Sequence, residues 1–127
     1  MSGVILVIED DELLRFSLTQ WLELEGHRVI EARDGREALS KLGRGLRPDV
    51  IVLDLLLPEM SGWEFRRAQL AEPALAEIPV LLASGAGAVA EEAAALGAAG
   101  HIEKPFRMRR VLEMVAPFAR RERGQSA

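Results

Sequence analysis

Polar side chains directly follow four short strand-like segments of this 127-residue chain. Glu9 and Asp10 follow the first of these segments, Asp54 a second, Ser84 a third, and Lys104 the last. Three carboxylates brought to one place repel one another unless a cation joins them. Mg²⁺ takes oxygen ligands and is usually bound by one or two carboxylates together with phosphate oxygens. These residue types therefore predict a hard-cation site, should the fold bring them together.

The same residues carry the elements of phosphoryl transfer. Glu9, Asp10 and Asp54 could hold one Mg²⁺ (or Mn²⁺) while Asp54 stays reachable. An aspartate can act as a nucleophile and take up a phosphoryl group as an aspartyl phosphate. This reaction needs positioning and neutralisation of charge, which the ion and the ammonium group of Lys104 supply. The hydroxyl of Ser84 can donate a hydrogen bond to a phosphoryl oxygen.

Each of these residues also has a purely structural interpretation. The acidic run 10–12 could cap a helix and complement its dipole, and Asp54 could be a turn residue before Pro58. Ser84, which precedes a glycine, fits a turn, and a single lysine such as Lys104 is usually a solvated cation. The combination is more specific than its parts, because every member follows a strand-like segment.

The apolar segments themselves predict a parallel sheet. Residues 4–8, 50–53 and 80–83 are continuous, rich in branched side chains and without alternation, which is typical of strands covered by helices on both faces. Two weaker candidates, 27–31 and 99–103, contain polar residues and fit the edges of the sheet.

Helix-length segments lie between the predicted strands. Asp11 is placed to cap the first helix and Gly26 to end it, Pro73 ends the third, and Pro105 starts the last, which closes at about residue 121. The first helix is expected to turn Leu14, Leu18, Trp21, Leu22 and Leu24 towards one face. The predicted ranges are 12–25, 36–42, 63–71, 88–96 and 105–121.

The strand and helix patterns alternate five times, and crossovers between parallel strands are right-handed. The sequence therefore predicts an α/β fold, a doubly wound (βα)5 three-layer sandwich. In such a sheet ligands bind at the carboxyl ends of the strands. This rule places all of the polar groups above at one edge.

Composition excludes several classes of protein. There is no cysteine, so thiolate metal sites and disulfides are excluded, and hydrophobic residues make up 49%, as in globular proteins. The net charge of −4 does not favour nucleic-acid binding, and no apolar run is long enough for a membrane span. No signal peptide is visible, so we expect a cytoplasmic protein. Residues 104–127 carry a net +5 against −9 for 1–103, which indicates either a polar partner surface or cations favoured by a helix dipole.

The motifs together resemble the receiver domain of bacterial two-component response regulators, the CheY-like family, over residues 3–121. The resemblance rests on Val7-Ile8-Glu9-Asp10-Asp11, Asp54-Leu55-Leu56-Leu57-Pro58 with Met60-Ser61-Gly62, Ser84, and Lys104-Pro105-Phe106. It implies a flavodoxin-like five-stranded sheet in the order 2-1-3-4-5. By the same resemblance, Asp54 is the phosphoacceptor, Glu9 and Asp10 are the acidic pair for Mg²⁺, and the backbone carbonyl of Leu56 is a further metal ligand.

The resemblance also implies how the domain would signal. A histidine kinase or phosphotransfer protein donates the phosphoryl group, Lys104 contacts it, and Ser84 is the switch hydroxyl. The Lys104–Pro105 peptide bond is expected to be cis. The face formed by helix 4, strand 5 and helix 5 then binds a downstream protein or a second copy of the domain. His101 stands where the family has an aromatic switch residue, and an imidazole can also change rotamer. Residues 122–127 are expected to form a tail or the start of a linker.

Other functions stay open at this point. The chain could be a phosphorylation-independent receiver that acts as a scaffold or dimerisation module. A second alternative is an aspartyl-phosphate phosphohydrolase on a similar sheet, but such an enzyme would carry a second aspartate where Leu56 stands. A third is a flavodoxin-like flavin binder, but the acidic residues at 9–12 would repel the phosphate of a flavin. We expect a signalling phosphoacceptor with only self-catalysed phosphoryl transfer and autodephosphorylation, either as a stand-alone receiver or as part of a longer regulator.

Overall fold

Five strands and five helices alternate along the chain in the computed structural model. It describes residues 3–85 and 89–126, with the side chains of residues 89 and 120–126 left aside. All strand pairs are parallel, and the order β2-β1-β3-β4-β5 confirms the predicted doubly wound α/β fold. The elements are β1 (Val4–Ile8), α1 (Glu12–Leu24), β2 (Arg28–Ala32), α2 (Gly35–Gly43), β3 (Val50–Asp54), α3 (Gly62–Ala71), β4 (Val80–Ser84), α4 (Val89–Ala95), β5 (Gly100–Glu103) and α5 (Met108–Ser126).

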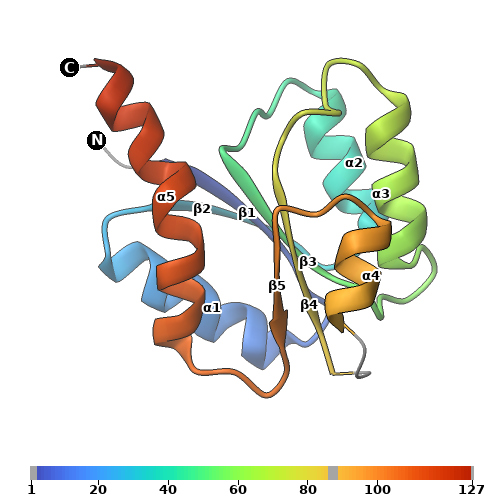
Figure 1. Ribbon diagram of the computed structural model, residues 1–127, viewed down its shortest axis with the longest axis horizontal. Coiled ribbons are helices and arrows are strands. Elements are labelled where there is room, and N and C mark those ends of the chain that lie inside the picture. The colour runs from blue at the N-terminus through green and yellow to red at the C-terminus, as the bar shows by residue number, and fades with distance from the viewer. Residues whose placement is uncertain (1–2, 86–88, 127) are drawn as a thin grey trace.

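The helices cover both faces of the sheet, which gives three layers (Figure 1). α1 and α5 lie on one face, and α2, α3 and α4 lie on the other. Successive side chains of a strand point to opposite faces, so β1, β3 and β4 serve both cores. Within β1, Ile5 and Val7 pack towards α1 and α5, whereas Leu6 and Ile8 pack towards the other three helices. This double burial explains why the strand sequences lack polar alternation.

Side-chain caps begin the first three helices. The carboxylate of Asp11 accepts hydrogen bonds from the backbone N–H groups of the first turn of α1, as predicted, and Asp34 caps α2 in the same way. Ser61 and Glu64 form a reciprocal capping box at the start of α3. Gly26 follows the end of α1 with φ +92°, a conformation that favours glycine. The helix starts therefore fix the loops that leave the carboxyl ends of β1 and β3.

The buried face of α1 is narrower than predicted. Leu18 and Leu22 are buried, but Trp21 is 48% exposed and Leu24 78% exposed. Successive residues of a helix are about 100° apart, which places Trp21 about 80° and Leu24 about 140° from the Leu18–Leu22 row that meets the sheet, both on the same side of it. The prediction that both belong to the inner face was wrong.

The last helix also differs from its prediction. α5 begins at Met108 and continues to Ser126, whereas the sequence predicted a helix from Pro105 to about residue 121. The four residues before Met108 form the turn that leaves β5, and Phe106 packs against the core shared by α1 and α5. This turn leaves Lys104 at the edge of the sheet. Residue 88, the predicted start of the fourth helix, lies outside the described residues.

No helix in the described part of the chain combines the length and the apolar character needed to cross a membrane.

Candidate functional site

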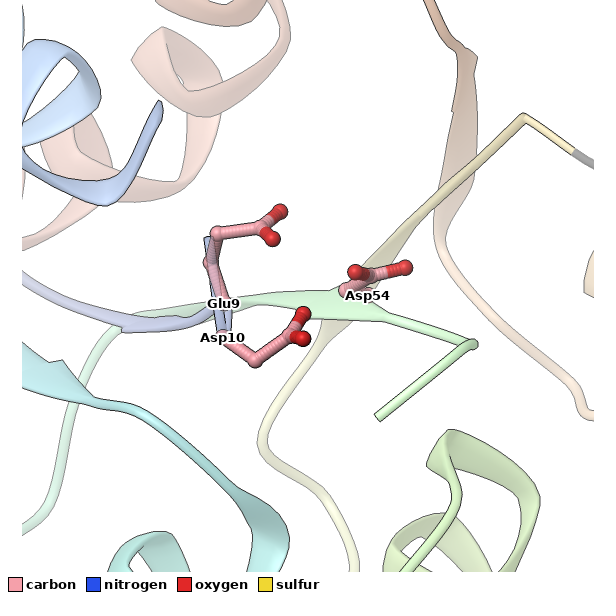
Figure 2. Close-up of side chains that lie close together, drawn as sticks. All are labelled: Glu9, Asp10 and Asp54. Carbon is pink, nitrogen blue, oxygen red and sulfur yellow. The ribbon is translucent and has the colours of Figure 1, made fainter. Parts of the chain in front are cut away.

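Three carboxylates from two neighbouring strands meet at the edge of the sheet (Figure 2). Glu9 and Asp10 follow β1, and Asp54 is the last residue of β3, whose register pairs Ile8 with Leu53. One oxygen of each carboxylate lies within 4.8 Å of the others. Glu9 and Asp54 are 3% and 5% exposed, whereas Asp10 is open to solvent. The three acids therefore meet at the carboxyl ends of the parallel strands, as the sequence predicted.

Lys104 completes the cluster from the end of β5. Its ammonium group donates hydrogen bonds to Glu9 Oε1 at 2.9 Å and to Asp54 Oδ2 at 3.2 Å. Burial alone lowers the pKa of Lys104, but the hydrogen bond with Glu9 and the charge of Asp54 outweigh it, so the pKa is raised. Lys104 is therefore held as a cation between two buried carboxylates.

Glu9 is the most constrained of the three acids. Its Oε2 accepts a hydrogen bond from the backbone N–H of Asp11 at 3.0 Å, while Oε1 receives Lys104. Burial raises the pKa of Glu9, the charge of Asp54 adds to this rise, and the two hydrogen bonds oppose it. The net direction is upward. A further positive charge at this site would therefore stabilise the ionised form of Glu9.

Asp54 and Ser84 stand side by side at the ends of adjacent strands. Asp54 pairs in register with Ala83, the residue before Ser84. The Asp54 carboxylate also accepts the backbone N–H of Leu56 at 3.1 Å, which orients its plane. Ser84 is 1% exposed, and its backbone carbonyl accepts the N–H of Lys104 at 2.9 Å. β3, β4 and β5 thus bring Asp54, Ser84 and Lys104 to the same edge of the sheet.

The remaining predicted residues lie around this cluster. The Lys104–Pro105 peptide bond is cis. His101 is exposed on the edge strand β5, and Ile102 beside it points into the core shared with α1 and α5. By strand alternation the imidazole projects from the opposite face, the one that α4 covers. The side chain of Leu56 is 57% exposed, so its part in the predicted metal site rests on its backbone alone.

The donor set suits a hard divalent cation. Its ligand atoms are all carboxylate oxygens, the type that Mg²⁺ and Mn²⁺ prefer, and one of the three acids faces water, from which an ion would keep several of its own ligands. The buried position of Glu9 and Asp54 strengthens their electrostatic interaction with a cation. The residues present therefore fit such an ion.

Sequence reasoning missed one residue that touches this site. Arg15, on the second turn of α1, donates a hydrogen bond from Nη1 to the backbone carbonyl of Glu9 at 2.8 Å and another from Nε to Glu31 Oε1 at 2.9 Å. A signal was present, because Arg15 lies three and seven residues before Leu18 and Leu22, on the side of α1 that faces the sheet. A cation on the core-facing side of a helix requires a partner.

Two solved structures that this chain resembles are signal receivers. The structure resembles the chemotaxis response regulator CheY4 of Vibrio cholerae with a TM-score of 0.84 and 30% identity, covering 93% of this chain and 99% of that one. It resembles the receiver domain of a signal transduction histidine kinase from Syntrophus aciditrophicus with a TM-score of 0.81 and 32% identity, covering 91% and 89%. Fold and site together define a CheY-like receiver domain.

The sequence comparison leads to the same family. Residues 5–116 match the response regulator receiver domain. Response regulator MprA of Mycobacterium bovis is 36% identical over all of this chain and 55% of its own length. The Mycolicibacterium vanbaalenii protein of that name is 37% identical over 92% of this chain and 50% of its own length. This chain therefore belongs to the response regulator receiver domain family of two-component signalling, and it spans about half the length of these relatives.

Membership of the family settles the general role. Receiver domains are signalling proteins rather than classical enzymes, they generally bind Mg²⁺ at an acidic pocket, and response regulators interact with histidine kinases and with downstream targets.

Proposed function

We propose that this domain is a phosphoacceptor in a two-component phosphorelay and that Asp54 is the residue phosphorylated. A carboxylate oxygen of Asp54 attacks the phosphorus of a phosphohistidine on a kinase or phosphotransfer protein. A P–O bond to Asp54 forms, the P–N bond to the donor imidazole breaks, and the bonding electrons of that P–N bond leave with the imidazole. The hydrogen bond from the Leu56 N–H to the Asp54 carboxylate supports this role, because it holds the nucleophile in one orientation.

Glu9, Asp10 and Asp54 would hold Mg²⁺, with the backbone carbonyl of Leu56 as a further ligand. When bound, the ion supplies positive charge that offsets repulsion between the Asp54 carboxylate and the incoming phosphoryl oxygens. Lys104 contributes a second positive charge, and its ammonium group already lies 3.2 Å from Asp54 Oδ2. After the transfer, the ammonium group of Lys104 would move its hydrogen bond from the Asp54 carboxylate to a phosphoryl oxygen, because that oxygen carries more negative charge.

Ser84 and Lys104 connect the site to the face formed by α4, β5 and α5. Both stand at strand ends from which a chain segment runs on to a helix of this face. A hydrogen bond from the Ser84 hydroxyl to the new phosphoryl group would draw the end of β4 towards Asp54. We propose that this movement alters the face for a downstream protein or for a second copy of the domain, with His101 on β5 as a rotamer that responds. The domain would do this in the cytoplasm.

The single observation that carries the proposal is the contact of one lysine with two buried carboxylates beside an exposed third. Mass spectrometry after incubation with acetyl phosphate and Mg²⁺ tests it. We expect one added phosphoryl group on the unsubstituted chain, none after Asp54→Asn, and normal addition after Glu59→Gln, which removes an exposed carboxylate nearby. Addition that persists in Asp54→Asn, or that ignores removal of Mg²⁺ by a chelator, would contradict the proposal.

Exchange of backbone amides with deuterium, in the presence and absence of beryllofluoride, tests the switch. We expect changed protection in α4, β5 and the start of α5. Changes confined to other parts of the chain would contradict this part of the proposal. Partner binding that is the same in Asp54→Asn would instead favour the phosphorylation-independent scaffold.

A further inference from the structure

We propose that Arg15 is a positioning residue for the divalent cation: it orients the Glu9–Asp10 peptide so that Asp10 faces the ion. This inference rests on the proposed function, because it concerns the same cation. Arg15 contacts neither Asp54 nor the carboxylates of the acidic pair. Its guanidinium group reaches the backbone of Glu9 through the hydrogen bond from Nη1 at 2.8 Å.

The hydrogen bond acts on the plane of one peptide. The carbonyl oxygen of Glu9 and the N–H of Asp10 belong to the same rigid peptide unit, so a donor fixed to that oxygen sets the direction in which Asp10 leaves it. The N–H of Glu9 is fixed as well, since it donates to the carbonyl of Ala32 at 3.0 Å. With both of these groups bonded, the chain at Glu9 has little freedom to rotate.

Asp10 depends on this backbone more than its neighbours do. Glu9 and Asp54 are buried and tied to Lys104, but Asp10 is exposed. Within residues 3–85 and 89–119, its carboxylate has no hydrogen-bond or ion-pair partner. An unrestrained side chain loses rotamer freedom when it binds an ion, and a fixed backbone reduces the number of conformations that must be lost. Arg15 supplies that restraint.

Glu31 holds Arg15 in its place. The Nε group of Arg15 donates to Glu31 Oε1 at 2.9 Å, and the side chain of Arg15 is only 14% exposed. Glu31 lies on β2 opposite Val7 of β1, two residues before Glu9. The two hydrogen bonds therefore connect α1 and β2 to the loop that carries the acidic pair. Groups that orient metal ligands in this way typically change metal affinity by 10- to 100-fold when they are removed.

Charge and position predict effects of opposite sign, which makes the inference testable. Arg15 is a cation near a cation site, so by electrostatic repulsion alone its removal would strengthen metal binding. If Arg15 positions the acidic pair, its removal weakens binding. A residue that only stabilised the fold would lower the melting temperature and leave the affinity of the folded protein unchanged.

Titration calorimetry with Mg²⁺ alone, repeated with Mn²⁺, gives the test on the full chain. We expect Arg15→Met to weaken binding by about tenfold, and Arg15→Lys to weaken it although the charge is kept, because an ammonium group cannot reproduce the planar two-point contact. Arg33→Met is the matched control. It removes an exposed cation from the same side of the molecule, where Arg33 lies 3.8 Å from Glu37, and should leave binding unchanged or slightly stronger.

Each outcome decides the matter. Binding by Arg15→Met that equals or exceeds that of the unsubstituted chain overturns the role of Arg15 and leaves the metal site standing. No binding by the unsubstituted chain overturns both. Should Arg15→Met fail to fold, as shown by thermal unfolding, Arg15→Lys alone decides, since charge alone predicts no change for it and the positioning role predicts a loss.

Discussion

Replacement of Lys104 by methionine tests the electrostatic balance of the site. Methionine keeps much of the length of the side chain and removes the ammonium group that contacts Glu9 and Asp54. Both carboxylates are almost fully buried, so neither gains water in exchange. A charge-assisted hydrogen bond contributes about 1.5 to 3 kcal/mol, and the lower end applies because the side chain of Lys104 is 24% exposed. Two bonds at the lower end give a loss of about 3 kcal/mol.

The loss should depend on pH in a definite direction. Burial raises the folded-state pKa of Glu9 above its ordinary value of 4.5, and removal of Lys104 raises that pKa further. The folded state therefore binds the proton of Glu9 more tightly than the unfolded state does. The stability gained in this way is full below pH 4.5 and is lost as the pH rises through the raised pKa. The deficit of Lys104→Met should be complete at neutral pH and shrink towards about pH 4.5.

Urea unfolding of both proteins across this pH range measures the difference in the free energy of unfolding. Arg36→Met serves as the control, because its ion pair with Glu59 is exposed and long at 3.7 Å, and the change should be below about 0.5 kcal/mol. Mg²⁺ should restore part of the stability of Lys104→Met, since it replaces the missing charge. A deficit that is absent at neutral pH, or equal at all pH values, would refute the reasoning.

Three further predictions concern stability and are measured by denaturant unfolding. Arg66 is buried and donates hydrogen bonds to two carbonyl groups at the end of α4 and to Gln69. Arg66→Leu should therefore lower the free energy of unfolding by about 2 kcal/mol, whereas Arg67→Leu, at an exposed position, should change it little. Equal effects of the two substitutions would contradict this prediction. Gly62→Ala should lower the free energy of unfolding by at least about 1 kcal/mol, because a Cβ there would lie 2.7 and 2.8 Å from backbone atoms of residues 55 and 54. Gly43→Ala, whose Cβ would have nothing within 4 Å, should be neutral or stabilising. A Gly62→Ala protein as stable as the unsubstituted chain would contradict this prediction. The hydrogen bond and charges of the neighbouring carboxylates raise the pKa of Lys104. The contribution of Lys104 to the free energy of unfolding should therefore be full below its ordinary pKa of 10.5 and disappear as the pH rises through the raised pKa. Loss of this contribution well below pH 10.5 would contradict that sign.

Most of the fold could be predicted from the sequence, because the three central strands β1, β3 and β4 are buried on both faces. An uninterrupted apolar segment such as 50–53 admits few other interpretations, and caps such as Asp11 mark where the next helix starts. The site followed from one topological rule. Parallel strands end at the same edge, so residues far apart in the chain, such as Asp54 and Lys104, meet there.

Two kinds of feature could not be predicted: the rotation of a helix relative to the sheet, and the contacts that long side chains make with other elements. Trp21 lies about 60° from Leu18 around α1, and the angle at which α1 meets the sheet decides that it is 48% exposed. The contacts of Arg15 with Glu9 and of Arg66 with the end of α4 cross between elements. Such contacts depend on tertiary distances that no local pattern encodes.

The most direct test of the central claim is the location of the phosphoryl group. Acyl phosphates react with borohydride, so reduction after incubation with acetyl phosphate and Mg²⁺ marks the modified side chain for peptide mass spectrometry. We expect the mark at Asp54, and we expect it to disappear when Mg²⁺ is chelated. A mark at Asp10 or Glu9, or an unmodified chain under conditions in which a known receiver is labelled, would contradict the claim.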